Sequence, residues 1–394
     1  MKILHVMETP GQGSGRHVID LVEGMRDRGH DVHVVYSAIR ANPDFRSELE
    51  ALHGAGVTVR QIAMYRHPCP HDIASLLALR AYIRRYGPFD VVHGHSSKAG
   101  ALARLAAFGT SALRLYTPNA LVTLDPILHG WERRIYGAIE RWLSRISDAI
   151  ITVSPEEQAE ALALGISPKR VFLIFSGIKM PIARPRKEAR ARLGLREDNI
   201  CVGFVGRLVR QKAPERLLAA FATAAVDRPA LRLLIVGDGE LGAGMRQMAT
   251  TLSIGHKIIW TGEVQSSEFF AATDIFVLPS RFEGLSYSTM EAMGFGIPVV
   301  TTDAGGARTL VDHGVTGLII RQVHEPQVAT DLATALITLA DNGALRHDMA
   351  LAAIEKSRDF RAPRMVDEVV ELYHRLRASR VRGPIAMRAR SRAF

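Results

Sequence analysis

Short apolar runs alternate with longer amphipathic stretches along nearly the whole chain. The runs are rich in Val, Ile and Leu and are typical of buried strands, because β-branched side chains pack well on a pleated surface. Strands are expected at residues 2–6, 31–36, 57–62, 90–93, 113–117, 149–153 and 171–175, and again at 200–205, 231–236, 257–260, 274–278, 298–301 and 318–320. Helical patterns lie between them, for example at 15–28, 73–85 and 132–146. This alternation predicts βαβ units and parallel sheets, so the expected fold class is α/β.

A break in the pattern separates the two series of strands. Ser176-Gly177 ends the first series, a Pro- and Arg-rich stretch follows from residue 180 to 192, and the alternation restarts at residue 200. We therefore predict two doubly wound, Rossmann-like domains that face each other across a cleft. The expected boundary lies between residues 178 and 179.

Length and composition agree with two folded domains. The 394 residues are enough for two cores, and contents of 47% hydrophobic and 23% charged residues exclude a mainly disordered chain. No stretch approaches the ~20 apolar residues of a membrane span, and residues 1–6 are interpreted as a first strand and not as a secretion signal. Cys69 and Cys201 are the only cysteines, which excludes a disulfide framework and a Cys-based zinc site. These features predict a cytoplasmic protein.

The positive charge is concentrated in two segments. The chain has 50 Lys and Arg residues against 40 Asp and Glu, a net charge of +10, and the excess falls in 179–196 and in 380–394, which contains five Arg and no acid. The rest of the chain is near neutral, which argues against a nucleic-acid partner. We expect 380–394 to be disordered, and two interpretations of its charge stay open: a solvated tail, or attraction to an anionic membrane surface.

Two glycine-containing motifs stand directly after strands, where ligands bind in doubly wound sheets. The first, Gly11-Gln12-Gly13-Ser14-Gly15, precedes a helix whose N-terminus favours an anion. Its spacing is not that of the dinucleotide fingerprint, so a tight turn without a ligand is an equal alternative. The second runs from Gly206 to Lys212, and in it Arg207 and Lys212 either clamp a diphosphate or form a solvated surface pair.

The most informative motif follows the fourth strand of the second series and enters a helix. It reads Glu283-Gly284-Leu285-Ser286-Tyr287-Ser288-Thr289-Met290-Glu291. Gly284 frees backbone N–H groups for a ligand, and Ser286 or Ser288 can cap the helix. Glu283 and Glu291 can accept hydrogen bonds from hydroxyl groups, as sugar recognition requires. Eight helical residues would place these acids ~12 Å apart, further than the ~5–9.5 Å of a glycosidase pair, so hydroxyl binding fits better.

Together these motifs resemble those of glycosyltransferase family 4, whose members have the GT-B fold and retain the anomeric configuration of the transferred sugar. The resemblance rests first on Glu283-x7-Glu291 and the upstream Gly206-Arg207…Lys212, and it covers nearly the whole chain. Further matching segments are Gly296-Ile297-Pro298-Val299-Val300, Gly305-Gly306, His93-Gly94-His95-Ser96-Ser97-Lys98-Ala99-Gly100 and Tyr116-Thr117-Pro118-Asn119-Ala120. The last two look like segments of bacterial surface-polysaccharide members. The combination is specific to the family, whereas any single piece is not.

The resemblance implies a role for each candidate residue. The expected donor is a nucleotide sugar, a UDP-sugar by preference, which is a co-substrate; no other cofactor and no metal is expected. Arg207 and Lys212 would hold its diphosphate, Glu283 the transferred sugar and Glu291 the ribose. The remaining donor contacts would come from the backbone amides of Gly284, Leu285 and Ser286, from Val264 near the base, and from the loop with Gly13 and Gly15.

The resemblance also assigns parts of the reaction to the domains. Residues 1–178 would form the acceptor side, 179–358 would bind the nucleotide sugar, and a helix at 359–379 would cross back onto the first domain. The expected acceptor is a glycan or a polyprenyl-linked sugar.

One position departs from the family pattern. Many members have His where Asn119 stands, and that His touches the sugar or its leaving oxygen. Asn119 keeps hydrogen bonding but cannot shuttle a proton, which favours front-face transfer with a phosphate oxygen as the proton acceptor. His95 either lies nearby or is a buried structural residue. A metal shared by His93 and His95 is disfavoured, because the strand is expected to end at His93 and no third ligand is close in sequence.

These observations predict a retaining glycosyltransferase of the hexosyltransferase type that acts in the assembly of bacterial surface polysaccharide. Two alternatives stay open: a nucleotide-sugar epimerase of the same fold, and a catalytically inactive protein that binds a nucleotide sugar. The helix at 132–146 carries four Arg residues beside apolar ones. It either lies on a membrane surface or is an ordinary amphipathic helix with a solvated polar face, and the second interpretation is favoured.

Overall fold

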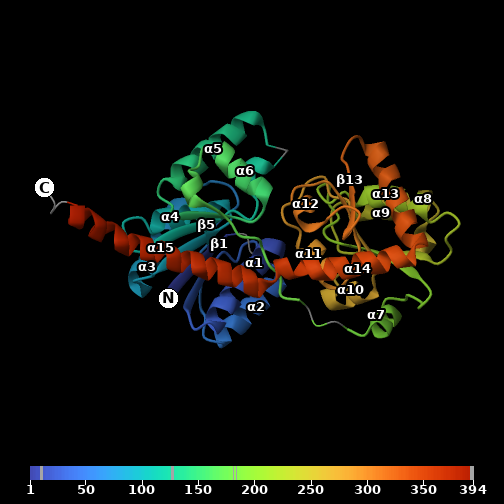
Figure 1. Ribbon diagram of the computed structural model, residues 1–394, viewed down its shortest axis with the longest axis horizontal. Coiled ribbons are helices and arrows are strands. Elements are labelled where there is room, and N and C mark those ends of the chain that lie inside the picture. Colours follow the sequence, from blue (N-terminus) through green and yellow to red (C-terminus); the bar gives the residue numbers. More distant parts are fainter. Residues whose placement is uncertain (9–11, 126–127, 181, 183, 391–394) are drawn as a thin grey trace. The chain divides into compact units, whose positions relative to one another are not determined.

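The computed structural model describes residues 1–8, 12–125, 128–180, 182 and 184–390 (Figure 1). The chain forms two compact units. The first unit contains Met1–Ile178 together with Ala362–Phe394, and the second contains Lys179–Arg361. The first boundary therefore falls after residue 178, at the break in the sequence pattern.

The first unit is built on a sheet with the strand order β3-β2-β1-β4-β5-β6-β7, in which all neighbouring strands are parallel. Its strands are β1 (Lys2–Met7), β2 (Asp31–Tyr36), β3 (Thr58–Gln61), β4 (Val91–His95), β5 (Leu113–Thr117), β6 (Ala149–Thr152) and β7 (Val171–Leu173). Its helices are α1 (Gln12–Asp27), α2 (Pro43–Gly54), α3 (His71–Tyr86), α4 (Ser97–Ala106), α5 (Gly130–Ser144), α6 (Pro155–Ala163) and α15 (Ala362–Arg390).

The second unit repeats this architecture with the order β10-β9-β8-β11-β12-β13, again parallel throughout. Its strands are β8 (Ile200–Val205), β9 (Leu231–Val236), β10 (Ile258–Thr261), β11 (Ile275–Leu278), β12 (Val299–Thr302) and β13 (Gly317–Ile320). Its helices are α7 (Arg186–Arg192), α8 (Pro214–Ala224), α9 (Gly242–Thr251), α10 (Ser266–Ala272), α11 (Tyr287–Gly294), α12 (Ala307–Leu310), α13 (Glu325–Asp341) and α14 (Gly343–Ser357).

Every strand expected from the apolar runs is present, and the two Rossmann-like units confirm the α/β fold class. One strand end differs in a way that matters. β4 continues to His95, because Met7 of β1 and Thr117 of β5 both pair with His95 and extend the ladder. The expectation that this strand ends at His93 is wrong.

The strand order reverses once in each sheet, and this locates the candidate site. β1 lies between β2 and β4 in the first unit, and β8 lies between β9 and β11 in the second. Ligands of doubly wound sheets bind beyond the carboxyl ends of the strands at such a reversal. The relevant segments are therefore those after β1 and β4 in the first unit and those after β8 and β11 in the second.

Helix α15 completes the first unit although it comes from the end of the chain (Figure 1). Val366 and Tyr373 are buried in the core that also contains Val18 of α1. The two helices approach closely at Gly24, where a Cβ atom would lie 2.6 Å from Val366 Cγ2. The helix then continues to Arg390, so residues 380–390, which we expected to be disordered, are helical. Arg and Ala, which make up six of the eleven residues from 380 to 390, are good helix formers, whereas Gly383-Pro384 in the same segment disfavours a helix.

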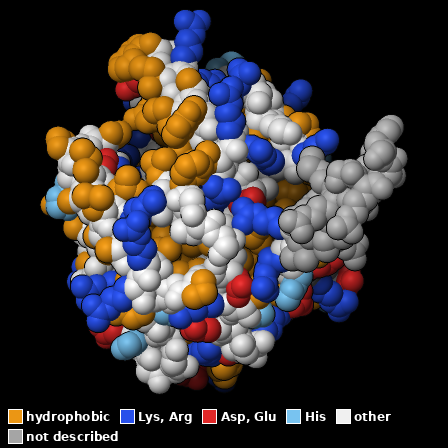
Figure 2. Space-filling view, turned by 90° about the vertical axis from the view of Figure 1, so that its left-hand side faces the viewer, with side chains coloured by type: hydrophobic (Ala, Val, Ile, Leu, Met, Phe, Trp, Pro, Cys, Tyr) orange, Lys and Arg blue, Asp and Glu red, His pale blue; other side chains and the backbone are white. Residues whose placement is uncertain are grey.

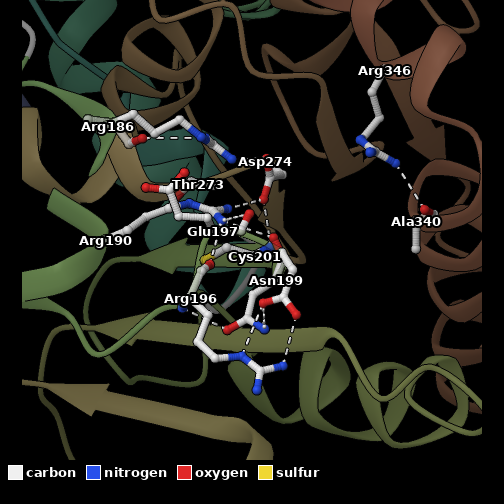
Figure 3. A network of polar contacts seen from close by, with 12 residues as sticks. Arg186, Arg190, Arg196, Glu197, Asn199, Cys201, Thr273, Asp274, Ala340 and Arg346 are labelled. Carbon is white, nitrogen blue, oxygen red and sulfur yellow. Dashed lines mark hydrogen bonds and ion pairs between the residues drawn. The ribbon is translucent and has the colours of Figure 1, made fainter. Parts of the chain in front are cut away.

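The basic stretch at the start of the second unit is a structural element and not only a linker. Arg190 is 2% exposed and donates to the backbone carbonyls of Arg196, Glu197 and Asn199. Asp274, which immediately precedes β11, accepts hydrogen bonds from Arg190, from Arg186 and from the Cys201 amide (Figure 3). Burial raises the pKa of the Cys201 thiol to about 12, so this cysteine has no nucleophilic role.

Within the residues that the structure describes, none of the helices combines the length and the apolarity needed to cross a bilayer.

Candidate functional site

The loops that follow β8 and β9 pack backbone against backbone. The Leu208 amide donates to the Asp238 carbonyl over 2.9 Å, and the Leu241 amide donates to the Leu208 carbonyl over 2.9 Å. Gly237 has a φ of +122°, and a Cβ atom there would lie 2.2 Å from the carbonyl oxygen of Gly206. Glycine is therefore required at 237 for this approach, which fixes the course of the segment carrying Arg207 and Lys212.

The loop after β11 is held by the loop after β12. Gly305 has a φ of +50°, and a Cβ atom on it would lie 1.8 Å from the carbonyl oxygen of Glu283. The Gly305-Gly306 pair noted in the sequence is thus explained by close packing. The β11 loop is also joined to the β8 loop, because the Arg281 amide donates to the Gln211 carbonyl over 2.8 Å.

Lys212 and Glu283 meet where these two loops join. Lys212 Nζ lies 2.5 Å from Glu283 Oε1, and the two side chains are only 15% and 11% exposed. Ser280 Oγ donates to the same carboxylate oxygen over 2.7 Å, which fixes its position. Arg207 is exposed in the same β8 loop. The structure therefore pairs Lys212 with Glu283, and it places Arg207 in the same loop as Lys212.

The other candidate residues of the second unit lie at the start of α11 and near β10. Ser286 caps α11 by accepting a hydrogen bond from the Thr289 amide, and its own side chain is 8% exposed. The amides of Gly284 and Leu285 therefore lie in the loop that leads into this N-terminus. Glu291 is inside α11, and Val264 is half-buried in the segment between β10 and α10.

A charged network behind the β11 loop was not foreseen. Arg216, 7% exposed, makes two 2.7 Å hydrogen bonds to Glu325 and donates to the Pro279 carbonyl at the end of β11. Arg281 binds Glu215 and Glu325. Hydrogen bonding from Arg216 lowers the pKa of Glu325 to about 2. The sequence signal that could have indicated this network is an arginine, Arg216, next to the two leucines Leu217 and Leu218 in α8.

In the first unit, the glycine motif after β1 forms part of a helix. α1 begins at Gln12, so Gly13 and Gly15 stand in its first turn and not in the expected preceding loop. Gly11 lies outside the described residues. The motif therefore supplies a helix N-terminus at the carboxyl end of β1, which suits an anionic ligand.

Asn119 follows β5 in a backbone conformation that few residues adopt. Its φ is +55° and that of Ala120 is +106°. Asn119 Nδ2 is buried and makes no hydrogen bond with any residue the structure describes. Glu157 holds the loop by accepting from the amides of Ala120 and Val153, each over 2.8 Å, and burial raises the pKa of this carboxyl to about 7.

His95 belongs to a buried cluster with His5, His93 and His17. One ring nitrogen from each of His5, His93 and His95 lies within 4.8 Å of the other two. His5 is therefore a third side chain that could bind a metal together with His93 and His95, and the spacing in the sequence did not show it. The nitrogens are largely engaged in hydrogen bonds: His5 with His95 over 2.9 Å, and His93 with Tyr373 and Thr117. Burial is the main cause that lowers the pKa of all four rings. A neutral hydrogen-bonded cluster accounts for these contacts, and His95, which is 0% exposed, lies inside it.

Solved structures with the same architecture identify the fold. HepE from Anabaena, in complex with UDP and glucose, is similar with a TM-score of 0.79 and 22% identity, over 94% of this chain and 99% of that chain. Sucrose-phosphate synthase from Thermosynechococcus elongatus is similar with a TM-score of 0.77 and 21% identity, over 96% and 100%. The fold is therefore that of the GT-B glycosyltransferases.

Sequence comparisons then identify the family. The model described as "Glycosyl transferase 4-like domain" matches residues 12–177, and that described as "Glycosyl transferases group 1" matches 185–356. A D-inositol 3-phosphate glycosyltransferase of Nocardioides sp. is 31% identical over 74% of this chain and 68% of its own length. The enzyme of the same name from Kribbella flavida is 28% identical over 90% and 89%. The chain belongs to the family that these two models describe, the group 1 glycosyl transferases with a glycosyl transferase 4-like domain, and is a glycosyltransferase.

Proposed function

We propose that this glycosyltransferase transfers a hexose from a UDP-sugar to an acceptor hydroxyl group with retention of the anomeric configuration. The pairing of Lys212 with Glu283 at the reversal point of the second sheet carries the proposal. A sugar diphosphate needs a cation for its phosphates and a hydrogen-bond acceptor for its hydroxyl groups, and the pair supplies both. The solved complexes of HepE with UDP and glucose support this choice of donor.

Donor binding in this proposal exchanges the partners of the pair. Lys212 and the exposed Arg207 then form ion pairs with phosphate oxygens of the donor. Glu283 keeps its hydrogen bond from Ser280 and accepts from hydroxyl groups of the transferred sugar. The two cations neutralise the leaving diphosphate, so we expect turnover to persist in the presence of EDTA.

The rest of the donor follows the segment into α11. The amides of Gly284, Leu285 and Ser286 contact the sugar and the phosphates, and a helix N-terminus favours this negative charge. Glu291 binds the ribose hydroxyl groups, and Val264 contacts the base. The N-terminus of α1, with Gly13 and Gly15, binds the phosphates from the first unit.

The reaction itself is front-face transfer. The bond between C1 and the diphosphate oxygen breaks, the acceptor oxygen bonds to C1 on the same face, and the acceptor proton passes to the leaving phosphate oxygen. The protein positions the groups and stabilises the charge that develops. Asn119 Nδ2, which has no other described partner, donates to the sugar and transfers no proton.

Two acceptors are supported by different observations. The similarity of residues 93–100 and 116–120 to surface-polysaccharide enzymes supports a glycan or polyprenyl-linked acceptor. The names of the relatives, D-inositol 3-phosphate glycosyltransferases, support an inositol phosphate. We propose that both reactions take place in the cytoplasm, where Cys69 and Cys201 stay reduced.

Release of UDP from a panel of UDP-sugars, with and without each acceptor, tests the proposal. UDP release that depends on one acceptor, with an α-linked product from an α-linked donor, is the expected result. An isomerised sugar formed without acceptor would instead show an epimerase. A donor that raises the melting temperature but is never consumed would show an inactive binding protein.

A further inference from the structure

Helix α5 exposes the side that an ordinary amphipathic helix buries. Trp131, Ile135, Ile139 and Trp142 are 62%, 51%, 45% and 51% exposed. Their spacing of four, four and three residues places them in one apolar stripe along the helix. The favoured expectation for this segment, an apolar face packed inward with a solvated polar face, is therefore wrong.

The inward side of α5 contains one large apolar residue, Leu143, which is 2% exposed, and its other buried residues are polar or small. Glu140 is 4% exposed, accepts from Arg104 over 3.0 Å and accepts from the hydroxyl group of Tyr116 over 3.2 Å. Gly137 packs so closely on Leu164 that a Cβ atom would lie 2.7 Å from it. A buried ion pair and a close contact thus attach the helix, and its apolar stripe is not needed for this attachment.

Three arginines follow one edge of the apolar stripe. Arg134, Arg141 and Arg145 are exposed, stand seven and four residues apart on one side of the helix, and form no ion pair with the residues that the structure describes. Arg133, on another side, pairs with Glu160 over 3.0 Å. Figure 2 shows one face of the molecule on which hydrophobic side chains gather with Lys and Arg side chains among them.

We propose that this apolar stripe docks the first unit on the surface of an anionic lipid bilayer. The stripe inserts between the headgroups, and its tryptophans occupy the interface, where their amphipathic rings are favoured. Arg134, Arg141 and Arg145 then lie against the anionic headgroups. A second copy of this chain fits less well, because a symmetric contact through the stripe would place the arginine row of one copy near that of the other.

A second basic segment begins close to the same helix. Arg380 of α15 donates to the Ser111 carbonyl over 2.9 Å and pairs with Asp148 over 2.6 Å. Asp148 stands only three residues after Arg145. The sequence beyond Arg380 contains four more arginines. Stable attachment to a bilayer usually takes two signals, and α5 supplies both an apolar stripe and a basic row.

The chain contains an internal probe for the experiment. Trp131 and Trp142 are two of its three tryptophans, and the third, Trp260, is in β10 of the second unit. A Trp260→Phe variant therefore reports on α5 alone. Its fluorescence should shift to the blue with vesicles of phosphatidylglycerol and phosphatidylcholine, shift less with phosphatidylcholine alone, and shift less at high salt. Brominated lipids should quench it.

Variants separate the two parts of the surface. Ile135→Ser with Ile139→Ser should lower co-sedimentation with anionic vesicles about tenfold. Arg134→Gln with Arg141→Gln and Arg145→Gln should remove the preference for anionic lipid. The second unit provides the matched controls. Leu351→Ser changes an apolar residue of α14 that is 57% exposed, and a triple variant changes Arg192, Arg196 and Arg358 to Gln. Both control variants should bind vesicles like the wild type.

Circular dichroism of each variant checks that it is folded. The proposal is overturned if the wild type does not bind, or if the α5 variants bind as it does. It is also overturned if light scattering shows a dimer without lipid that the isoleucine variant loses, since a second copy then covers the stripe. Vesicle binding needs no substrate, so these outcomes do not depend on the proposed function.

Discussion

Lys212 Nζ lies 2.5 Å from Glu283 Oε1, so a cation and an acid that the motifs assign to different parts of the donor are ion-paired with each other. Ser280 holds the carboxylate on a second side. A ligand must therefore replace a charge-assisted contact when it binds. Removing either residue leaves the charge of the other without its ion-pair partner at a position largely shielded from solvent.

Lys212→Ala is expected to lower turnover about 10²–10³-fold, because one preorganised charge on the leaving diphosphate is lost. Adding Arg207→Ala should abolish measurable turnover while the protein stays folded. UDP release with the identified acceptor measures both effects. Lys187→Ala, at an exposed lysine of α7, is the control and should leave turnover unchanged. Turnover of the purified double variant near the wild-type rate would remove the assignment.

Gly305→Ala should damage the site through the backbone. The new Cβ atom would meet the Glu283 carbonyl, and the φ of +50° is unfavourable for alanine, so the β11 loop must shift. We expect a lower melting temperature and a large loss of turnover. Gly244→Ala provides the opposite case, because nothing lies within 4 Å of its Cβ position in helix α9. It should raise stability by about 0.5–1 kcal/mol and leave turnover intact. Equal behaviour of the two variants would contradict this explanation.

Asn119→His should be tolerated, whereas Asn119→Ala should not. His is one of the few residues that adopt positive φ readily, and it keeps a hydrogen-bond donor for the sugar. Alanine removes the donor and is unfavourable at a φ of +55°, so we expect a loss of about 10²-fold in kcat together with a lower melting temperature. Steady-state kinetics at saturating donor separate the two. An alanine variant with wild-type kcat would show that Asn119 does not touch the sugar.

The histidine cluster should make the protein less stable in acid. Burial lowers the pKa of His5 to about 3 and that of His17 to about 4, and His93 and His95 are also well below 6.5. Below pH 6.5 the unfolded chain takes up protons that the folded protein does not, so the free energy of unfolding falls with pH. At pH 5 each such histidine costs about 2 kcal/mol. Denaturant titrations at pH 7 and pH 5 measure the loss.

Glu157 acts in the opposite direction and must be considered with the histidines. Its folded-state pKa of about 7 means that it favours the folded protein as the pH falls from 7 toward 4.5, but one acid does not offset four histidines. His17→Gln should reduce the loss between pH 7 and pH 5 by about 2 kcal/mol. His256→Gln, at an exposed position, should not change it. An unchanged pH dependence in the His17 variant would contradict the prediction.

The strands could be predicted because a parallel strand is buried on both faces and therefore has a continuous apolar sequence. Helix ends were less predictable. α1 begins at Gln12, three residues before the expected start, and α15 continues to Arg390 although Gly383-Pro384 is a stop signal in its sequence. The side of α5 that faces the sheet could not be predicted, because periodicity defines a stripe but does not show that Glu140 pairs with Arg104 inside.

Candidate residues could be selected from the sequence, but the contacts between them could not. Arg207, Lys212 and Glu283 were selected because they follow strands, and the carboxyl ends of neighbouring strands meet at one edge. That Lys212 binds Glu283 depends on β8 and β11 being adjacent, which residue spacing does not show. Residue spacing also does not show that His5 lies beside His93, because this contact depends on the pairing of β1 with β4.

The composition of the first core has a consequence for how the protein matures during synthesis. Val366, Val369 and Tyr373 fill that core, yet they leave the ribosome after the whole second unit, Lys179–Arg361. The second unit is contiguous and can fold as soon as it emerges, whereas the core of the first unit is completed only when α15 has been made. We therefore expect the nascent N-terminal half to need protection from aggregation for longer than its place in the chain suggests.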